Sequence, residues 1–173
     1  MTEAEEVYSV VDGRDRVIGS APRRILHSGG SKLIHRAVHV FVVNDRGEIA
    51  VQKRSVRKDR YGGLYGSSAS GHVEAGETYR KAAERELSEE LPSVSGRLLR
   101  VAKFLVETEY EREYSVLYVC RFSGRIEFSR DEADAVEYLS LVEIEGKRVK
   151  GLLAPAFEKA LDEYKRCCAK FRF

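Results

Sequence analysis

Three of the six glutamates in the stretch 71–93, which reads GHVEAGETYRKAAERELSEELPS, are crowded near its end. Glu86 and Glu90 are four residues apart, so they share one face of a helix, and Glu89 lies beside them. Like charges at this spacing cost about 0.2–0.5 kcal/mol per pair. Hard divalent cations such as Mg²⁺ and Mn²⁺ bind clustered carboxylate oxygens. The residues alone therefore leave two interpretations open, a metal-binding helix or a Glu-rich surface helix.

The residues around these glutamates predict the helix that must position them. Thr78 is a suitable N-cap, and Pro92 is expected to stop the helix after Leu91. An apolar ridge of Ala83, Leu87 and Leu91 follows the i, i+4, i+8 spacing of one helix face. The pattern predicts a helix that packs one face on a core and presents carboxylates on another.

The whole stretch resembles the Nudix box, the loop-helix-loop motif of the Nudix hydrolases. The matching residues are Gly71, Glu77, Arg85, Glu86, Leu87, Glu89 and Glu90. Every charged position of the box is filled, and Pro92 stands where the family usually has Gly. The resemblance implies a salt bridge between Glu77 and Arg85 that holds the loop against the helix. It also implies cleavage of a nucleoside diphosphate, or another diphosphate, linked to a group X.

The resemblance assigns metal-binding roles to four of these residues. Glu86 and Glu90 match the principal metal ligands, Glu89 is a supporting ligand, and the Gly71 carbonyl is an extra one. We therefore expect Mg²⁺ or Mn²⁺ as the cofactor. The metal would neutralise the diphosphate and activate water. The general base varies among Nudix enzymes, so the prediction names Glu89 or Glu90.

A basic run leads into a glycine-rich connection at 55–70. The cations are Lys53, Arg54, Arg57, Lys58 and Arg60. Cations next to a glycine loop suit polyanionic ligands such as diphosphates, although a solvated surface loop has the same composition. We predict Lys53, Arg54 and Lys58 as the residues that bind the substrate phosphates.

Residues flanking the box are similar to the isopentenyl-diphosphate isomerase branch of the superfamily. They are Val11, Asp12, Val17, Ile18, Gly19, His27, His35, Arg36, Ala37, Val38, Ser70, Gly71 and His72. In that branch, histidines and a Glu-x-Glu build an additional metal site. The resemblance implies a second site for Mn²⁺ or Zn²⁺ made of His27, His35, His72, Glu111 and Glu113. The alternative is structural. The histidines would then be strand residues with hydrogen-bond partners inside the core, and the glutamates would be charged residues of a hairpin.

One residue departs from the isomerase pattern. The isomerases carry a catalytic cysteine just before the Gly-His pair, and this chain has Ser70 there. A hydroxyl is a far weaker acid than a thiol, whose pKa is about 8.5. The sequence therefore favours a hydrolase, with isopentenyl-diphosphate isomerase as the alternative. A non-catalytic diphosphate-binding module is a third possibility. Its sequence would be expected to lack the carboxylates of the box.

Composition sets further expectations. The net charge of +2 is too small to favour nucleic acid, and no apolar run is long enough to span a membrane. The N-terminus has no signal-peptide pattern, and three cysteines, two of them adjacent, favour a reducing compartment. We expect a cytoplasmic protein with a small-molecule diphosphate as its partner. The oligomeric state is left open: Cys167, Cys168 and the apolar tail 171–173 either form the interface of a dimer or fray at the end of the chain.

The order of expected elements predicts an α+β fold. Strands are expected at 7–11, 17–19, 35–43, 48–54, 98–106, 114–122, 126–128 and 135–139, and helices at 22–27, 78–91, 141–144 and 154–168. The Nudix resemblance implies an α/β/α sandwich with a mixed β-sheet. We expect one domain, 1–173, with an N-terminal hairpin and lead-in at 1–34, the box at 71–93 and a C-terminal helix at 154–168.

Overall fold

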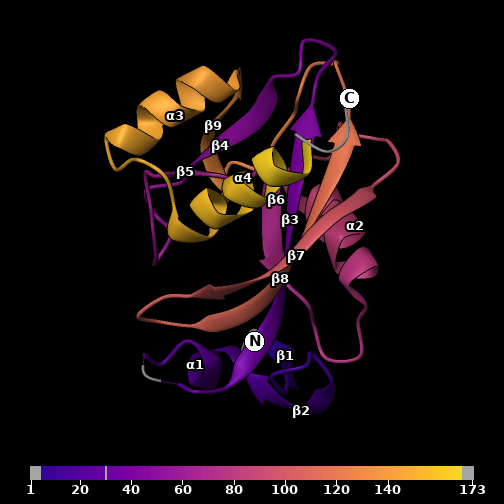
Figure 1. Cartoon of the computed structure of the whole chain (residues 1–173), viewed down its shortest axis with the longest axis vertical. Helices are drawn as coiled ribbons and strands as arrows, with labels where there is room; N and C mark the ends of the chain where they lie inside the picture. The colour runs from indigo at the N-terminus through magenta and orange to yellow at the C-terminus, as the bar shows by residue number, and fades with distance from the viewer. Residues whose placement is uncertain (1–4, 30, 169–173) are drawn as a thin grey trace.

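A mixed β-sheet with helices on both faces forms the protein (Figure 1). The computed structural model describes residues 5–29 and 31–168, and within them the sheet has nine strands. The tail 171–173 lies outside the described residues, so its expected role at an interface stays a prediction. No helix in the described part of the chain is long and apolar enough to cross a membrane.

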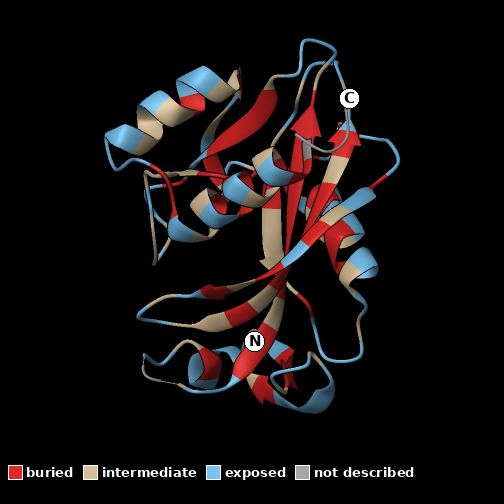
Figure 2. Cartoon of the chain, in the orientation of Figure 1, coloured by how far each residue is buried: buried red, intermediate tan, exposed pale blue. Residues whose placement is uncertain are grey.

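Strand β3 (Ile34–Val43) is the axis of the sheet. It pairs in parallel along its whole length with β8 (Arg112–Arg121) and antiparallel with β6 (Ala69–His72). Its first residues pair with β1 (Val7–Val11), and its last residue pairs with β4 (Ile49–Arg54). A nearly continuous apolar run suits such a strand, because it is covered on both faces (Figure 2).

The remaining strands extend this axis. β2 (Val17–Pro22) pairs with β1, and β7 (Leu99–Glu107) pairs with β8. β5 (Tyr65–Gly66) and β9 (Ala133–Leu139) pair with β4. The expected strand at 126–128 is wrong, since these residues lie outside any strand.

The sequence predicted a connection without strands at 55–70. This prediction is wrong for the second half, which contains β5 and the start of β6. Serine and glycine have low intrinsic strand preference, so the local pattern did not indicate strands there. Pairing with β3 and β4, which are distant in sequence, decides the conformation instead.

Two hydrophobic cores lie on opposite faces of the sheet. Alternate side chains of β3 point to opposite faces, so Val40 packs under α2 (Tyr79–Glu90) and Phe41 packs under α4 (Pro155–Cys168). Helix α3 (Leu141–Val149) adds Ile144 to the α4 side. The α/β/α sandwich is therefore confirmed.

Helix α2 begins and ends close to where the sequence indicates. The hydroxyl of Thr78 accepts a hydrogen bond from the backbone N–H of Lys81, and the helix ends at Glu90, two residues before Pro92. Its expected apolar ridge is buried in the core: Ala83, Leu87 and Leu91. Burial of the ridge fixes the helix rotation, and this rotation directs the carboxylates toward the end of β6.

The N-terminal hairpin of β1 and β2 is followed by the short helix α1 (Arg23–Leu26). The hairpin turn is tied to the sheet by Asp15, which adopts a left-handed backbone with φ of 61°. The Asp15 carboxylate accepts hydrogen bonds from Arg36 at 2.6 Å, from the Tyr79 hydroxyl at 3.1 Å and from Lys103. The sequence indicated only a turn here, yet the carboxylate joins the hairpin to β3, β7 and α2.

We expect Asp15→Ala to lower the free energy of unfolding by about 2–3 kcal/mol, because it leaves two cations without their carboxylate. Urea denaturation measures the change. Asp15→Asn keeps an acceptor oxygen and tolerates the left-handed backbone, so its loss should be smaller. An Asp15→Ala midpoint equal to that of the wild type would contradict the prediction.

Candidate functional site

The end of β6 separates two clusters of metal-binding side chains. Successive strand residues point to opposite faces, so Gly71 faces α2 and His72 faces the α4 side. The box cluster comprises Glu86, Glu89 and Glu90, and the histidine cluster comprises His27, His35, His72, Glu111 and Glu113. Residues of both clusters line one cleft of about 410 Å³.

Within the box cluster, Glu86 and Glu90 are held against the backbone of β6. Glu90 Oε1 accepts the backbone N–H of Ser70 at 2.9 Å, and Oε2 accepts the side-chain amide of Gln52 at 2.5 Å. Glu86 lies directly against Gly71, where an added Cβ would be 2.0 Å from Glu86 Oε1. Glycine is therefore required here so that the carboxylate can approach the strand.

The carboxylates of Glu86 and Glu90 are harder to ionise than an ordinary glutamate. Burial raises the pKa of Glu86 to about 7 and that of Glu90 to about 8. Arg85 opposes this shift at Glu86, while the charges of Glu89 and Glu132 add to it. Two acidic groups that resist ionisation until a cation joins them are a donor set that suits Mg²⁺ or Mn²⁺.

Arg85 joins the loop to the helix. Its guanidinium donates to both oxygens of Glu77, at 3.2 and 3.0 Å, and to the backbone carbonyl of His72 at 2.9 Å. A further N–H donates to Glu86 Oε1 at 2.7 Å. Arg85 and Glu77 are thus in contact, with one guanidinium bridging the loop, β6 and the helix.

Glu89 differs from the other two glutamates of the box. Its side chain is 59% exposed, and its carboxylate lies 3.5 Å from the Arg85 guanidinium. It lines the cleft without the backbone and amide contacts that hold Glu90. Glu89 is therefore free to contact water in the cleft.

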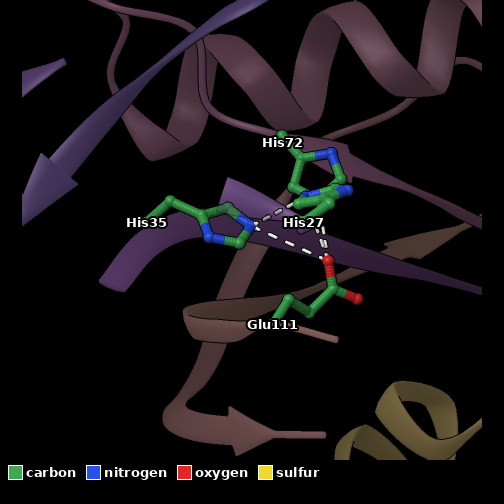
Figure 3. A group of neighbouring side chains, drawn as sticks. All are labelled: His27, His35, His72 and Glu111. Atoms are coloured by element: carbon green, nitrogen blue, oxygen red, sulfur yellow. Dashed lines mark hydrogen bonds and ion pairs between the residues drawn. The ribbon is translucent and has the colours of Figure 1, made fainter. Parts of the chain in front are cut away.

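The histidine cluster converges on one point (Figure 3). One ligand atom from each of His27, His35, His72 and Glu111 lies within 4.8 Å of every other. The Nε2 atoms of His27 and His35 are 3.3 Å apart, and Glu111 Oε2 is 3.0 Å from His27 Nε2. The cluster is assembled from four segments: the residue that follows α1, strand β3, strand β6 and the residue that precedes β8.

Glu113 joins this group from β8. The parallel register places it beside His35, and its Oε2 is 3.6 Å from His35 Nε2 and 3.7 Å from His72 Nε2. All five residues of the expected second site are therefore brought together.

The donor set of the histidine cluster fits a divalent cation. Burial lowers the pKa of His35 and of His72, so their rings stay neutral and keep a nitrogen lone pair. Glu111 Oε2 is buried, and among the described residues it has no hydrogen-bond partner. Imidazole nitrogens and carboxylate oxygens directed at a common point suit Mn²⁺ or Zn²⁺.

Two of the three expected phosphate-binding residues line the cleft, Arg54 and Lys58. The buried Nε of Arg54 has no hydrogen-bond partner in the described part of the chain, and Lys58 pairs with Glu132. Lys53 is exposed and is absent from the cleft lining, because neighbouring residues of β4 point to opposite faces.

The sequence did not identify three other residues of the site. Gln52 is 3% exposed and holds Glu90, and its only signal was a polar residue after the apolar run of β4. Glu132 lies close enough to affect the pKa of Glu86 and Glu90, but it stood out only as part of an acidic stretch. The ring of Tyr8 stacks on His72 with centroids 4.6 Å apart, and no local pattern indicated this contact.

The fold and the box cluster of this chain are those of the Nudix class of proteins. The NUDIX domain family model matches residues 33–161, and the chain belongs to the Nudix hydrolase family. An uncharacterized Nudix hydrolase of Pseudomonas aeruginosa is 31% identical over 134 residues, which are 78% of either chain.

The chain is also similar to a relative named as an isomerase and to a solved structure. Isopentenyl-diphosphate Delta-isomerase 2 of Photorhabdus laumondii is 31% identical over 145 residues, covering 81% of this chain and 80% of the relative. The crystal structure of DR0079 from Deinococcus radiodurans has a TM-score of 0.78 at 24% identity, covering 94% of this chain and 99% of that one. Relatives named as isomerases and as hydrolases are thus about equally similar, so the reaction must be argued from the site.

Proposed function

We propose that the chain is a hydrolase that cleaves the diphosphate linkage of a nucleoside diphosphate, or of another diphosphate linked to a group X, with Mg²⁺ or Mn²⁺. The observation that carries this proposal is the seating of both carboxylates against β6, Glu86 at Gly71 and Glu90 at the backbone N–H of Ser70. A cation beside these two carboxylates would offset the cost of ionising them, since desolvation raises the pKa of each.

Each residue of the box cluster has a role in this proposal. Glu86, Glu90 and the Gly71 carbonyl would hold the cation, while Glu89 supports them. When bound, such a cation neutralises the diphosphate and lowers the pKa of a water molecule. Gln52 and the Ser70 backbone N–H orient Glu90 through the hydrogen bonds described above.

The general base is Glu89 or Glu90 in this proposal. Both Glu90 oxygens already accept hydrogen bonds, whereas the Glu89 carboxylate is mostly exposed to the cleft. This difference favours Glu89 as the group that accepts the proton of the attacking water. Arg54 and Lys58, which line the same cleft, would bind the phosphates of the substrate.

A second cation site is proposed at the histidine cluster. Its donors are His27, His35, His72, Glu111 and Glu113, and it lies on the opposite side of β6 from the box cluster. Residues from both clusters line the same cleft, so a bound diphosphate can be oriented by both.

Isopentenyl-diphosphate isomerase is the second candidate function. The assembled histidine cluster and the similarity to isomerases favour it. Ser70 disfavours it, because the hydroxyl replaces a far more acidic thiol. A non-catalytic binding module is less well supported, since Glu86, Glu89 and Glu90 are all present.

A panel of nucleoside, sugar and prenyl diphosphates with Mg²⁺ or Mn²⁺ tests the proposal. We expect cation-dependent cleavage at the diphosphate, identified by mass spectrometry of the products. Incubation of isopentenyl diphosphate in D₂O should leave its carbon-bound hydrogens unexchanged. Deuterium incorporation without cleavage of any panel member would replace the hydrolase by the isomerase.

A further inference from the structure

His39 is a buried histidine that belongs to neither cluster. It lies on β3 on the same face as His35 and is 5% exposed. Its Nδ1 is 2.8 Å from the hydroxyl oxygen of Ser67. Its Nε2 is buried and has no hydrogen-bond partner among the described residues, but it lies 4.0 Å from Glu113 Oε1.

The surroundings of His39 select one tautomer. If Nδ1 carried the proton, the lone pair of Nε2 would face the carboxylate of Glu113, which is repulsive. If the Ser67 hydroxyl donates to Nδ1, then Nε2–H points toward Glu113 and attracts it. The second arrangement forms a directed chain from Ser67 through His39 to Glu113.

The two oxygens of Glu113 have different neighbours. Oε1 accepts a hydrogen bond from the Ser115 hydroxyl at 2.9 Å and faces His39 Nε2. Oε2 faces the Nε2 atoms of His35 and His72 at 3.6 and 3.7 Å. One oxygen is therefore held by the strand face, and the other is directed at the histidine cluster.

The ring of His39 is held in place on its other side. Phe104 of β7 stacks on it with ring centroids 6.0 Å apart. With Ser67 fixing one ring nitrogen and Phe104 covering one ring face, the imidazole keeps its orientation toward Glu113. An apolar side chain of similar size would fill this space without burying a polar nitrogen, so packing alone does not account for a histidine.

We propose that His39 is a positioning residue for Glu113, an inference that rests on the second cation site proposed above. Its Nε2–H attracts Oε1 electrostatically across 4.0 Å, so that Oε2 remains directed at His35 and His72. Partners of this kind behind a metal ligand typically change metal affinity by about 10- to 100-fold. His39 thereby tunes the affinity of the histidine cluster for Mn²⁺ without touching the metal.

The experiment isolates the histidine cluster from the box. In the full chain with Glu86→Gln and Glu90→Gln, Mn²⁺ binding is measured by electron paramagnetic resonance. Pulsed spectra detect the imidazole nitrogens coupled to the bound ion, which report on geometry independently of activity. We expect His39→Leu to weaken Mn²⁺ binding at least about tenfold and to change these couplings.

Two variants make the test specific. His39→Gln places an amide donor near the position of Nε2, so it should recover most of the lost affinity. Val40→Ala removes buried volume from the next position of β3, on the opposite face, and should leave Mn²⁺ affinity unchanged. If His39→Leu and Val40→Ala lower the Mn²⁺ affinity equally, the effect of His39 is one of general packing, and the inference is overturned.

The remaining outcomes are also decisive. Unchanged Mn²⁺ affinity in His39→Leu, or a His39→Gln variant as weak as His39→Leu, overturns the positioning role. Absence of imidazole-coupled Mn²⁺ in the parent with His39 intact refutes the second cation site itself. The hydrolase proposal stands apart from both results, because it depends on the box cluster.

Discussion

Glu90→Gln is expected to abolish cation-dependent hydrolysis, with a fall in kcat of about 10³-fold or more. Loss of a ligand charge removes several kcal/mol of transition-state stabilisation by the cation, and each ~1.4 kcal/mol is a factor of ten. The change is nearly isosteric, and the amide oxygen can still accept the Ser70 N–H that Glu90 accepts at 2.9 Å, although the new amide nitrogen cannot accept from Gln52. A circular dichroism spectrum equal to that of the wild type shows that the loss reports on charge rather than on folding. Release of phosphate or nucleotide, measured with and without Mg²⁺, gives the rates.

Glu84→Gln is the matched control on the same helix. Glu84 lies on the exposed face of α2 and forms a surface ion pair with Arg80 at 2.9 Å. Such pairs contribute about 0–1 kcal/mol to stability, so this variant should hydrolyse substrate at the wild-type rate. Wild-type rates in Glu90→Gln would refute the role of the box carboxylates.

Glu90→Gln should also change how the free energy of unfolding depends on pH in the metal-free protein. Burial raises the pKa of Glu90 from an ordinary value of 4.5 to about 8. Between these values the folded state keeps a proton that the unfolded state releases, so stability falls as pH rises from about 5 to about 8. Glu90→Gln removes this contribution, and its melting temperature in EDTA at pH 8 should exceed that of the wild type. Parallel melting-temperature profiles for the two proteins would contradict the cause given for the raised pKa.

Gly71→Ala is the second change with a large expected effect. The added Cβ would lie 2.0 Å from Glu86 Oε1, so the carboxylate must leave its place against β6. The chain should still fold, because the displaced atoms are the far end of a flexible side chain. We expect Mg²⁺ affinity and kcat each to fall by about tenfold or more, as for other changes that misplace a ligand.

A second glycine provides the control for the methyl group alone. Gly19 in β2 has nothing within 4 Å of an added Cβ, so Gly19→Ala should leave stability and activity nearly unchanged. Circular dichroism and calorimetric titration with Mg²⁺ separate folding from cation binding. If Gly71→Ala binds Mg²⁺ with wild-type affinity, Glu86 is not a ligand in the position described.

Helix α2 was predictable from the sequence because its determinants are local. The Thr78 cap, the apolar ridge and the stop before Pro92 all lie within the helix or next to it. A short segment was enough to predict these features, since neighbours in sequence are neighbours in space on a helix. The contact of Arg85 with Glu77 was implied only by the resemblance to the Nudix box, because Glu77 precedes the helix.

The rest of the site depends on pairing between distant segments. His35 lies beside Glu113 only because β3 and β8 run in parallel in one register. Composition indicates neither the partner nor the register of a strand, so residue similarity alone suggested this cluster. Asp15 and Gln52 were missed for the same reason, as their partners come from other strands and from α2.

The two clusters draw on very different lengths of chain, with a consequence for how the protein matures. The box cluster uses β6 and α2, which adjoin in sequence, whereas the histidine cluster needs α1 to meet the start of β8. Contacts between distant segments form slowly, because the intervening loop must close first. During synthesis on the ribosome, all three glutamates of the box cluster are made before Glu111 and Glu113 of the histidine cluster. Under the two cation sites proposed above, the newly made protein would therefore complete the donor set of the box first.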